Sequence, residues 1–236
     1  MESKVILFRC SQLGKLMTEA RSKSESISET TKNYLDEVYA DKFLGRRKDI
    51  VNKYIQKGLL VEEDAITLYS RVTKELFLKN ETNLKNDFIS GTPDLYIGES
   101  VTNATEVIDI KSPWDIWTFL KHKREALNND YYWQLQGYMW LTGARTATLA
   151  YCLVDTPLVL ITDQKRKFMW NAGILEENKV TDEVFELIEK NCTYDDLPLN
   201  DRVHIIVIPY FEEDILRLQT RIMECREYMK KTYRLS

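Results

Sequence analysis

The sequence is poor in the residues that build cross-linked or zinc-binding proteins, with four cysteines and two histidines among 236 residues. The cysteines are Cys10, Cys152, Cys192 and Cys225. They lie far apart and form no CxxC pair, so the sequence predicts neither a disulfide framework nor a zinc ribbon. His122 and His204 are also far apart in the sequence, which argues against a histidine-rich zinc site.

The sequence also lacks long hydrophobic runs and long tracts of proline, glycine or serine. No stretch resembles a membrane span, and the apolar run after Lys4 is too short for the core of a signal peptide. We therefore expect a cytoplasmic protein without a membrane segment. With 44% hydrophobic residues and no linker-like tract, the chain can bury one sizeable core, so we expect a single domain over residues 1–236.

Positive charge is not in excess, because the formal net charge is -4. This balance argues against a protein that coats nucleic acid with a uniformly basic surface, but it is compatible with a DNA enzyme whose metal site is acidic. Local basic clusters occur at 46–48, 121–124 and 165–167. Each is more often a solvated surface than a phosphate contact, so each is a weak indication of nucleic-acid binding.

Helical patterns begin early in the chain. Ser26 and Glu29 have the spacing of a capping box, and apolar residues then recur at helical intervals until Gly45. The polar residues 21–31 predict a loop before this helix is established. A second helix is expected at 49–57, ended by Gly58. Further helices are expected at 60–74, 114–127, 130–142, 181–191 and 211–230.

Short stretches with a strand period lie between these helices. Those at 75–79, 88–90, 95–97 and 106–111 are expected to pair as an antiparallel sheet, and later strands are expected at 146–153 and 203–208. Thr156 and Pro157 have the form of a helix start that leads towards Trp170, although 159–162 also fits a strand. The order of elements predicts an α/β (α+β) fold, with a central mixed sheet flanked by helices.

The most informative segments are GTPDLYIG at 91–98 and EVIDIK at 106–111. In a strand, Asp109 and Lys111 point to one face while the isoleucines beside them point to the other. Asp94, before the preceding strand, can meet Asp109 across a hairpin. Two such carboxylates form a site for a hard divalent ion such as Mg²⁺, which acidifies a bound water beside the lysine. The alternative is an exposed hairpin whose polar face meets solvent.

Polar residues on two helices add to this pattern. Glu62 can supply one more carboxylate, although an acidic helix start more often compensates the helix dipole. Gln134 and Tyr138 share a helix face and can orient a phosphate or the lysine, with Gln136 nearby. Their alternative role is that of ordinary polar residues on an amphipathic helix.

Taken in order, these segments resemble the lambda exonuclease or YqaJ-like viral recombinase family of PD-(D/E)xK nucleases. The likeness rests on the following segments: SQLGKLM, SETTKNYLDEVYADKFLG, the stretch from Gly58 to Tyr69, SGTPDLYIG, EVIDIKSP and YYWQLQGYMWLTG. Their order and spacing are more specific than any one of them. The resemblance implies a restriction-endonuclease-like PD-(D/E)xK core.

The resemblance also implies roles for individual residues. Glu62, Asp94, Asp109 and the backbone carbonyl of Ile110 would be metal ligands, and Lys111 would be the catalytic lysine. Gln134 and Gln136 match the glutamines that follow the core motif. Asp109 stands where the family usually has glutamate, an accepted variation that could shift the metal slightly. Arg21 and Lys23 are both candidates for the basic residue that holds the 5′ phosphate of the DNA.

The leading hypothesis is a Mg²⁺-dependent exonuclease, in which Mn²⁺ can replace Mg²⁺, that digests linear double-stranded DNA from 5′ to 3′ for phage or prophage recombination in a bacterial cell. The resemblance implies a homotrimer and a single-strand annealing protein as partner. One alternative is an endonuclease or a single-strand exonuclease on the same core. Relatives of that kind often hold an iron–sulfur cluster through three cysteines near the end of the chain. Only Cys192 and Cys225 lie late in this chain, and that count disfavours the cluster. The other alternative is an inactive module that binds DNA ends.

Overall fold

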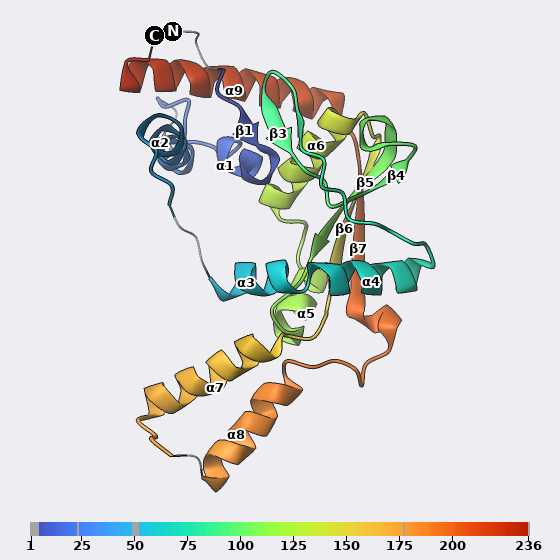
Figure 1. Ribbon diagram of the computed structural model, residues 1–236. Coiled ribbons are helices and arrows are strands. Elements are labelled where there is room, and N and C mark those ends of the chain that lie inside the picture. The colour runs from blue at the N-terminus through green and yellow to red at the C-terminus, as the bar shows by residue number, and fades with distance from the viewer. Residues whose placement is uncertain (1–4, 23, 49–51, 177, 236) are drawn as a thin grey trace.

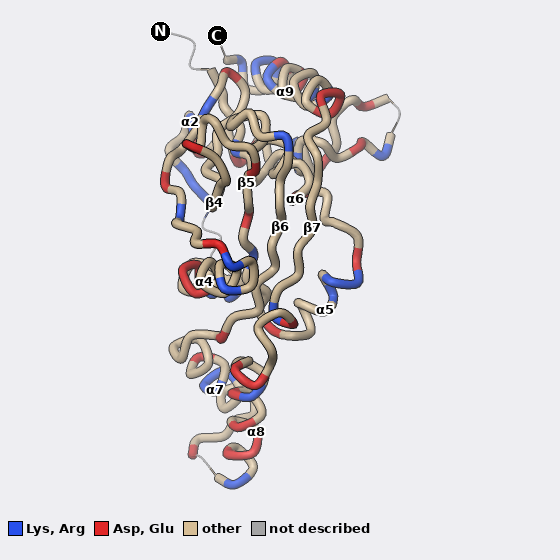
Figure 2. Tube along the Cα trace, turned by 90° about the vertical axis from the view of Figure 1, so that its right-hand side faces the viewer, with Lys and Arg blue, Asp and Glu red and all other residues tan. Residues whose placement is uncertain are grey.

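A four-stranded mixed sheet forms the centre of the computed structural model, which describes residues 5–22, 24–48, 52–176 and 178–235 (Figure 1). The strands are β4 (Leu95–Gly98), β5 (Ala104–Lys111), β6 (Thr146–Cys152) and β7 (Val203–Pro209), in that order across the sheet. The central pair β5–β6 is parallel and the two outer pairs are antiparallel. Figure 2 shows the four strands side by side. The predicted mixed sheet with flanking helices is confirmed.

A second, smaller sheet contains β1 (Phe8–Arg9), β3 (Ile89–Gly91) and β2 (Leu84–Lys85), with β3 in the middle. The strand predicted at 88–90 is therefore present, but it pairs with β1 and β2 rather than with the motif strands. The parallel partner β1 lies about eighty residues earlier in the chain, and a local pattern carries no information about such a distant pairing. The single antiparallel sheet predicted from four consecutive strands is wrong.

The strand predicted at 75–79 is also wrong, because this segment is irregular. Phe77 packs beside Tyr69, with their ring centroids 5.3 Å apart, whereas Leu76 and Leu78 are exposed. The alternating side chains produced a strand-like pattern. The segment instead ends at Asn80, whose N–H donates to the carbonyl of Asp94.

Helices surround the two sheets. Their bounds are α1 (Leu13–Leu16), α2 (Glu29–Leu44), α3 (Lys53–Leu60), α4 (Glu62–Thr73), α5 (Ile116–Arg124), α6 (Asn129–Thr142), α7 (Leu158–Ala172), α8 (Lys179–Lys190) and α9 (Glu212–Tyr233). Among the described residues, no helix is long and apolar enough to cross a membrane. All the predicted helices are present, with boundaries that differ by a few residues.

Two predicted helix boundaries are corrected by hydrogen bonds. The N-cap of α2 is Ser28 rather than Ser26, since the Ser28 hydroxyl accepts from the Thr31 N–H at 3.0 Å. Gly45 ends this helix in the left-handed conformation, as predicted. Gly58 does not end α3 but lies inside it. The first residues predicted for that helix, 49–51, lie outside the described part of the chain.

The segment after β6 forms a helical hairpin of α7 and α8 that projects away from the sheet (Figure 1). Helix α7 begins after Pro157, so the strand considered at 159–162 is excluded and Thr156 is not the cap. Helix α8 begins with a capping box, in which Asn178 and Thr181 bond each other's backbone N–H groups. The aromatic rings of Phe168 and Phe185 pack edge-on between the two helices.

The two faces of the sheet bury different side chains of β5. Val107 joins the core with residues of α6 and α9, whereas Ile108 and Ile110 join the core beneath α4. This alternation follows from the strand period. It places Asp109 and Lys111 on the α6 face, at the end of β5 where α3 and α4 cross the molecule.

Candidate active site

The two acids and the lysine of the motif lie together at the neighbouring ends of β4 and β5. The Lys111 Nζ lies 2.5 Å from the Asp109 Oδ2. Asp94 precedes β4 directly, and its Oδ2 accepts a hydrogen bond from the Ile110 N–H at 2.7 Å. The antiparallel register pairs Leu95 with Ile108, which brings Asp94 next to Asp109. The structure thus joins three of the predicted site residues in one place.

Helix α6 holds the carboxylate of Asp109 from above the sheet. The Gln134 Nε2 donates to the Asp109 Oδ1 at 2.9 Å and also lies 2.9 Å from the hydroxyl of Tyr138. Gln134 and Tyr138 share a helix face because they are four residues apart. One oxygen of Asp109 therefore meets an amide and the other meets an ammonium. Since Asp109 is 1% exposed, water has little access to either contact.

The charges at this site are unevenly balanced. Burial raises the pKa of Asp94, and the neighbouring carboxylate of Asp109 raises it further. Burial by itself lowers the pKa of Lys111, but the charges of Asp109 and Asp94 outweigh it, so that the pKa is raised. A carboxylate that resists ionisation beside a lysine that keeps its proton indicates surplus negative charge. Such a site favours an additional cation.

Glu62 approaches the same region from the first turn of α4. Its Oε2 forms an ion pair with the Lys79 Nζ at 2.7 Å. Glu62 is half-buried and lines the same cavity as Asp94 and Lys111. The Glu62 carboxylate thus lines the cavity while it is paired with Lys79.

The donor set fits a divalent cation through Asp94 and Asp109. Carboxylate oxygens are the ligands that Mg²⁺ prefers, and it keeps several waters beside one or two of them. The Asp109 Oδ2 is buried and accepts no hydrogen bond of good geometry, although Lys111 lies close to it. Within the described ranges, no three acidic, histidine or cysteine side chains already form a metal cluster. Glu62 does not complete such a cluster, because its carboxylate is paired with Lys79.

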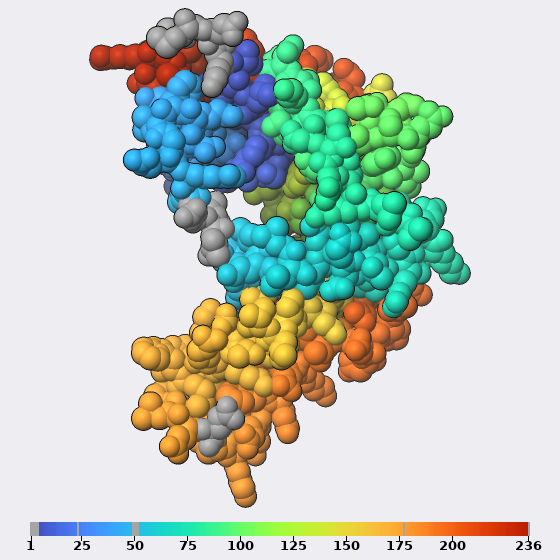
Figure 3. Space-filling model, viewed as in Figure 1, coloured from blue at the N-terminus to red at the C-terminus, as the bar shows by residue number. Residues whose placement is uncertain are grey.

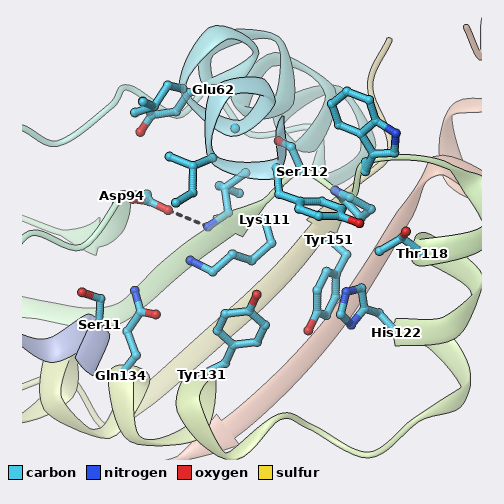
Figure 4. A pocket seen from close by; sticks show the side chains of 17 residues that line it. Ser11, Glu62, Asp94, Lys111, Ser112, Thr118, His122, Tyr131, Gln134 and Tyr151 are labelled. Atoms are coloured by element: carbon cyan, nitrogen blue, oxygen red, sulfur yellow. Dashed lines mark hydrogen bonds between the residues drawn. The ribbon is translucent and has the colours of Figure 1, made fainter. Parts of the chain in front are cut away.

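These groups line a cavity of about 530 Å³. Figure 3 shows the surface hollowed between the N-terminal segment, α3 and α4, with α6 at the bottom of the hollow. Figure 4 shows that the cavity has two unlike sides, with Lys111 between them. Ser11, Glu62, Asp94 and Gln134 lie on one side. Thr118, His122 and Tyr151 lie on the other.

The remaining predicted binding residues do not line this cavity. Gln136 is fully buried, and its amide bonds the Pro209 carbonyl and the Phe211 N–H where β7 meets α9. Tyr138 contacts the site through Gln134 only. Arg21 is exposed in the loop before α2. Lys23 lies outside the described residues.

The sequence analysis missed several residues that line the cavity. Ser11 follows β1 and sits beside Gln134, and Tyr131 lies one helical turn before Gln134 on α6. The Lys111 Nζ lies 5.2 Å from the centre of the Tyr131 ring. The sequence could have indicated Tyr131, because it precedes Gln134 by three residues and shares its helix face. Ser11 and Tyr151 come from distant segments, and no local pattern indicated them.

Comparisons with known proteins identify a family and a shared fold. A model of the YqaJ-like viral recombinase domain matches residues 9–145. A phage-related exonuclease from Haemophilus somnus 129PT is 25% identical, with a TM-score of 0.72 over 97% of this chain and 95% of that chain. No curated protein gives a match.

An alkaline exonuclease from Laribacter hongkongensis shares the fold, with a TM-score of 0.61 at 17% identity over 98% of this chain and 95% of that one. Its complex with dAMP gives a TM-score of 0.59 at 18% identity over the same shares of the two chains. The matched residues 9–145 include the acids, the lysine and Gln134, and they make up more than half of the chain. The chain belongs to the YqaJ-like viral recombinase family, whose nucleases act in phage-type recombination.

Proposed function

We propose that this protein is a Mg²⁺-dependent exonuclease that digests linear double-stranded DNA from 5′ to 3′. The observation that carries the proposal is the convergence of Asp94, Asp109 and Lys111 on one cavity. Two buried carboxylates with surplus negative charge suit a divalent ion, and a lysine within reach of both suits hydrolysis of a phosphodiester. A solvated hairpin, the alternative for the same motif, does not bury an acid to 1% exposure.

Asp94 and Asp109 would hold the ion, with the Ile110 carbonyl and Glu62 as further ligands. When bound, the ion acidifies a water and neutralises charge on the phosphate. Lys111 donates its N–H groups to the attacking water and to the phosphate oxygens, and so stabilises the charge that develops during hydrolysis. Gln134 keeps Asp109 in place through its amide.

Digestion from an end, rather than internal cleavage, is supported by the exonucleases that share this fold. Release of mononucleotides is supported by the dAMP bound in one of them. The basic residue that receives the 5′ phosphate is either Arg21 or Lys23. A homotrimer and a single-strand annealing protein are the assembly and the partner that the family resemblance implies.

The test uses a linear duplex labelled at one end or the other, with or without a 5′ phosphate. Mg²⁺, Mn²⁺ and EDTA are compared for the unmodified protein and for Lys111→Ala. We expect labelled mononucleotides from the 5′ end first, only with metal present. Lys111→Ala should lower the rate by about 10²- to 10³-fold, the range for losing one donor that stabilises charge developing in the transition state.

Three outcomes would overturn parts of this proposal. Cleavage of a circular duplex at the same rate would identify an endonuclease. Preference for the single strand would identify a single-strand exonuclease. Binding of DNA ends without release of nucleotides, by both Lys111→Ala and the unmodified protein, would identify an inactive end-binding module.

A further inference from the structure

The side of the cavity opposite the acids is aromatic. His122 on α5 and Tyr151 on β6 lie there, and the other rings that line the cavity are Tyr54 on α3, Trp114 after β5 and Tyr131 on α6. None of these has a role in holding a metal ion. Because phosphate and metal chemistry need only the acidic side, the aromatic side is free to bind another part of the substrate.

Both histidines of the chain lie in this region, against the same tyrosine. The rings of His122 and Tyr151 are stacked, with centroids 4.4 Å apart at 13°. Tyr151 pairs in register with Lys111 on one side and with His204 on the other. Its ring centroid lies 6.2 Å from that of His204, again at 13°. A row of side chains therefore runs across the sheet from the catalytic lysine to a stack of rings.

The two histidines differ in one respect, because His122 lines the cavity and His204 does not. Burial lowers the pKa of His122, so its ring is favoured in the neutral form. A neutral imidazole is a poor partner for a phosphate but stacks on other rings. Tyr151 is 2% exposed, and its ring covers one face of the imidazole. His122 is thus a fixed, half-exposed ring at the wall of the cavity.

Positive charge stands next to this ring on the same helix. The last turn of α5 carries Lys121, Lys123 and Arg124, all exposed. Sites that bind single strands combine a basic track for the backbone with aromatic rings on which bases stack. Stacking tolerates any sequence because every base has a π face. The wall around His122 has both features.

We propose that the aromatic side of the cavity receives a nucleobase of the strand being cut, and that the base stacks on His122. The inference rests on the proposed nuclease function and adds the subsite that holds a base while its phosphate lies at Lys111. The His122 ring orients the strand without discriminating between the bases. Digestion then depends on a base being present at one position near the cut, whichever base it is.

The test compares His122→Ala, His122→Phe and His204→Ala on duplexes with an abasic site at the first, second or third nucleotide from the digested end. His204→Ala is the matched control, since it removes the same kind of ring from the same tyrosine outside the cavity. We expect His122→Ala to lower kcat/KM about tenfold on intact DNA, a typical effect of losing one stacked base. His122→Phe should keep most of the rate, and His204→Ala should keep all of it. At one abasic position, His122→Ala should cause no further loss.

A separate binding measurement distinguishes this inference from the nuclease proposal. DNA with 2-aminopurine at each of the three positions is bound to Lys111→Ala in Mg²⁺, and the fluorescence quenched by stacking is recorded. The quenching should occur at one position and disappear when His122→Ala is added to the same variant. If quenching is absent at every position, or persists without the imidazole, the base subsite is wrong even where cleavage is observed. If quenching depends on His122 but the unmodified protein cleaves no DNA, the nuclease proposal is wrong and the base subsite stands.

Discussion

The side chain of Asp94 accepts a hydrogen bond from the backbone N–H of Ile110 at 2.7 Å, across the hairpin of β4 and β5. Ile110 stands between Asp109 and Lys111, so this one contact sets the spacing of all three catalytic candidates. The remaining charge of Asp94 faces the carboxylate of Asp109, which raises its pKa together with burial. Asp94 is therefore held in place by the Ile110 N–H while its negative charge is repelled by that of Asp109.

Replacing Asp94 by asparagine should stabilise the metal-free protein at neutral pH. Burial and Asp109 raise the pKa of Asp94 from 3.8 to about 7. Between these values the folded chain holds a proton that the unfolded chain releases, so this carboxyl lowers the free energy of unfolding as pH rises. Asp94→Asn keeps an oxygen that accepts from the Ile110 N–H, and it removes the loss of unfolding free energy that the carboxyl causes as pH rises. We expect a higher Tm than the parent at pH 8 in EDTA, by roughly 2–4 °C for each kcal/mol.

The same pair of proteins tests metal binding. Added Mg²⁺ should raise the Tm of the parent, because a ligand bound only by the folded state stabilises it. It should leave Asp94→Asn nearly unchanged, and the advantage of the variant in EDTA should vanish at pH 4. A variant that melts below its parent at pH 8 would contradict the surplus of negative charge inferred for this site.

Gln134→Leu should lower activity without unfolding the protein. Its Nε2 contacts both the Asp109 Oδ1 and the Tyr138 hydroxyl at 2.9 Å. Partners of metal-binding side chains typically contribute 10- to 100-fold in activity or metal affinity, so we expect a loss of about that size. Tyr138→Phe, the control, removes only the second contact and should lose far less. Equal losses for the two variants, measured as kcat and as the Mg²⁺ dependence, would show that Tyr138 acts on its own.

The alternating pattern of β5 was sufficient to predict that Asp109 and Lys111 share a face, and the hairpin spacing was sufficient to bring Asp94 to them. These are relations within about twenty residues, set by strand geometry. The aromatic wall could not be predicted in this way. His122 and Tyr151 meet because β5 and β6 pair in parallel across an intervening pair of helices. Ser11 reaches the other side of the cavity because β1 joins a second sheet. Such contacts depend on tertiary packing, which local periodicity does not encode.

Gln136 shows the limit of helix position as a guide to function. It is two residues from Gln134, and that spacing turns it to a different side of α6. Its chemistry resembles that of Gln134, but the packing of α9 decides its partners. The difference between the predicted cap of α2, Ser26, and the observed cap, Ser28, has a similar origin. Ser28 is buried against Thr31 and Thr18, and tertiary contacts thus selected one of two serines that the local sequence treats alike.

Lys57→Met should stabilise the protein most at neutral pH and progressively less above pH 8. Lys57 is fully buried on α3, with its Nζ donating to the Trp114 carbonyl at 3.0 Å. Burial lowers its pKa from 10.5 to about 8, against the opposing effect of nearby acidic groups. Between these values the unfolded chain binds more protons, so the stability of the parent rises with pH while that of the variant does not. The difference in Tm should therefore shrink between pH 8 and pH 10.5.

Lys53→Met is the matched control for Lys57→Met. Lys53 is one turn earlier on the same helix, exposed, with its Nζ 4.6 Å from the centre of the Trp114 ring. Its replacement removes a lysine near the same tryptophan without removing a buried charge. The Tm difference for this variant should stay constant over the same range of pH. A parallel trend in both variants would mean that burial of Lys57 is not the cause.

Gln136→Ala should destabilise the fold while leaving the chemistry of the site intact. The side chain is 0% exposed, donates to the Pro209 carbonyl at 2.8 Å and accepts from the Phe211 N–H at 3.1 Å. Alanine removes two hydrogen bonds, each of which typically contributes about 0.5–1.5 kcal/mol. Chemical denaturation should show a loss of that order, whereas kcat at a temperature where the variant is folded should stay within about twofold. A large fall in kcat with unchanged stability would instead place Gln136 among the residues that bind DNA.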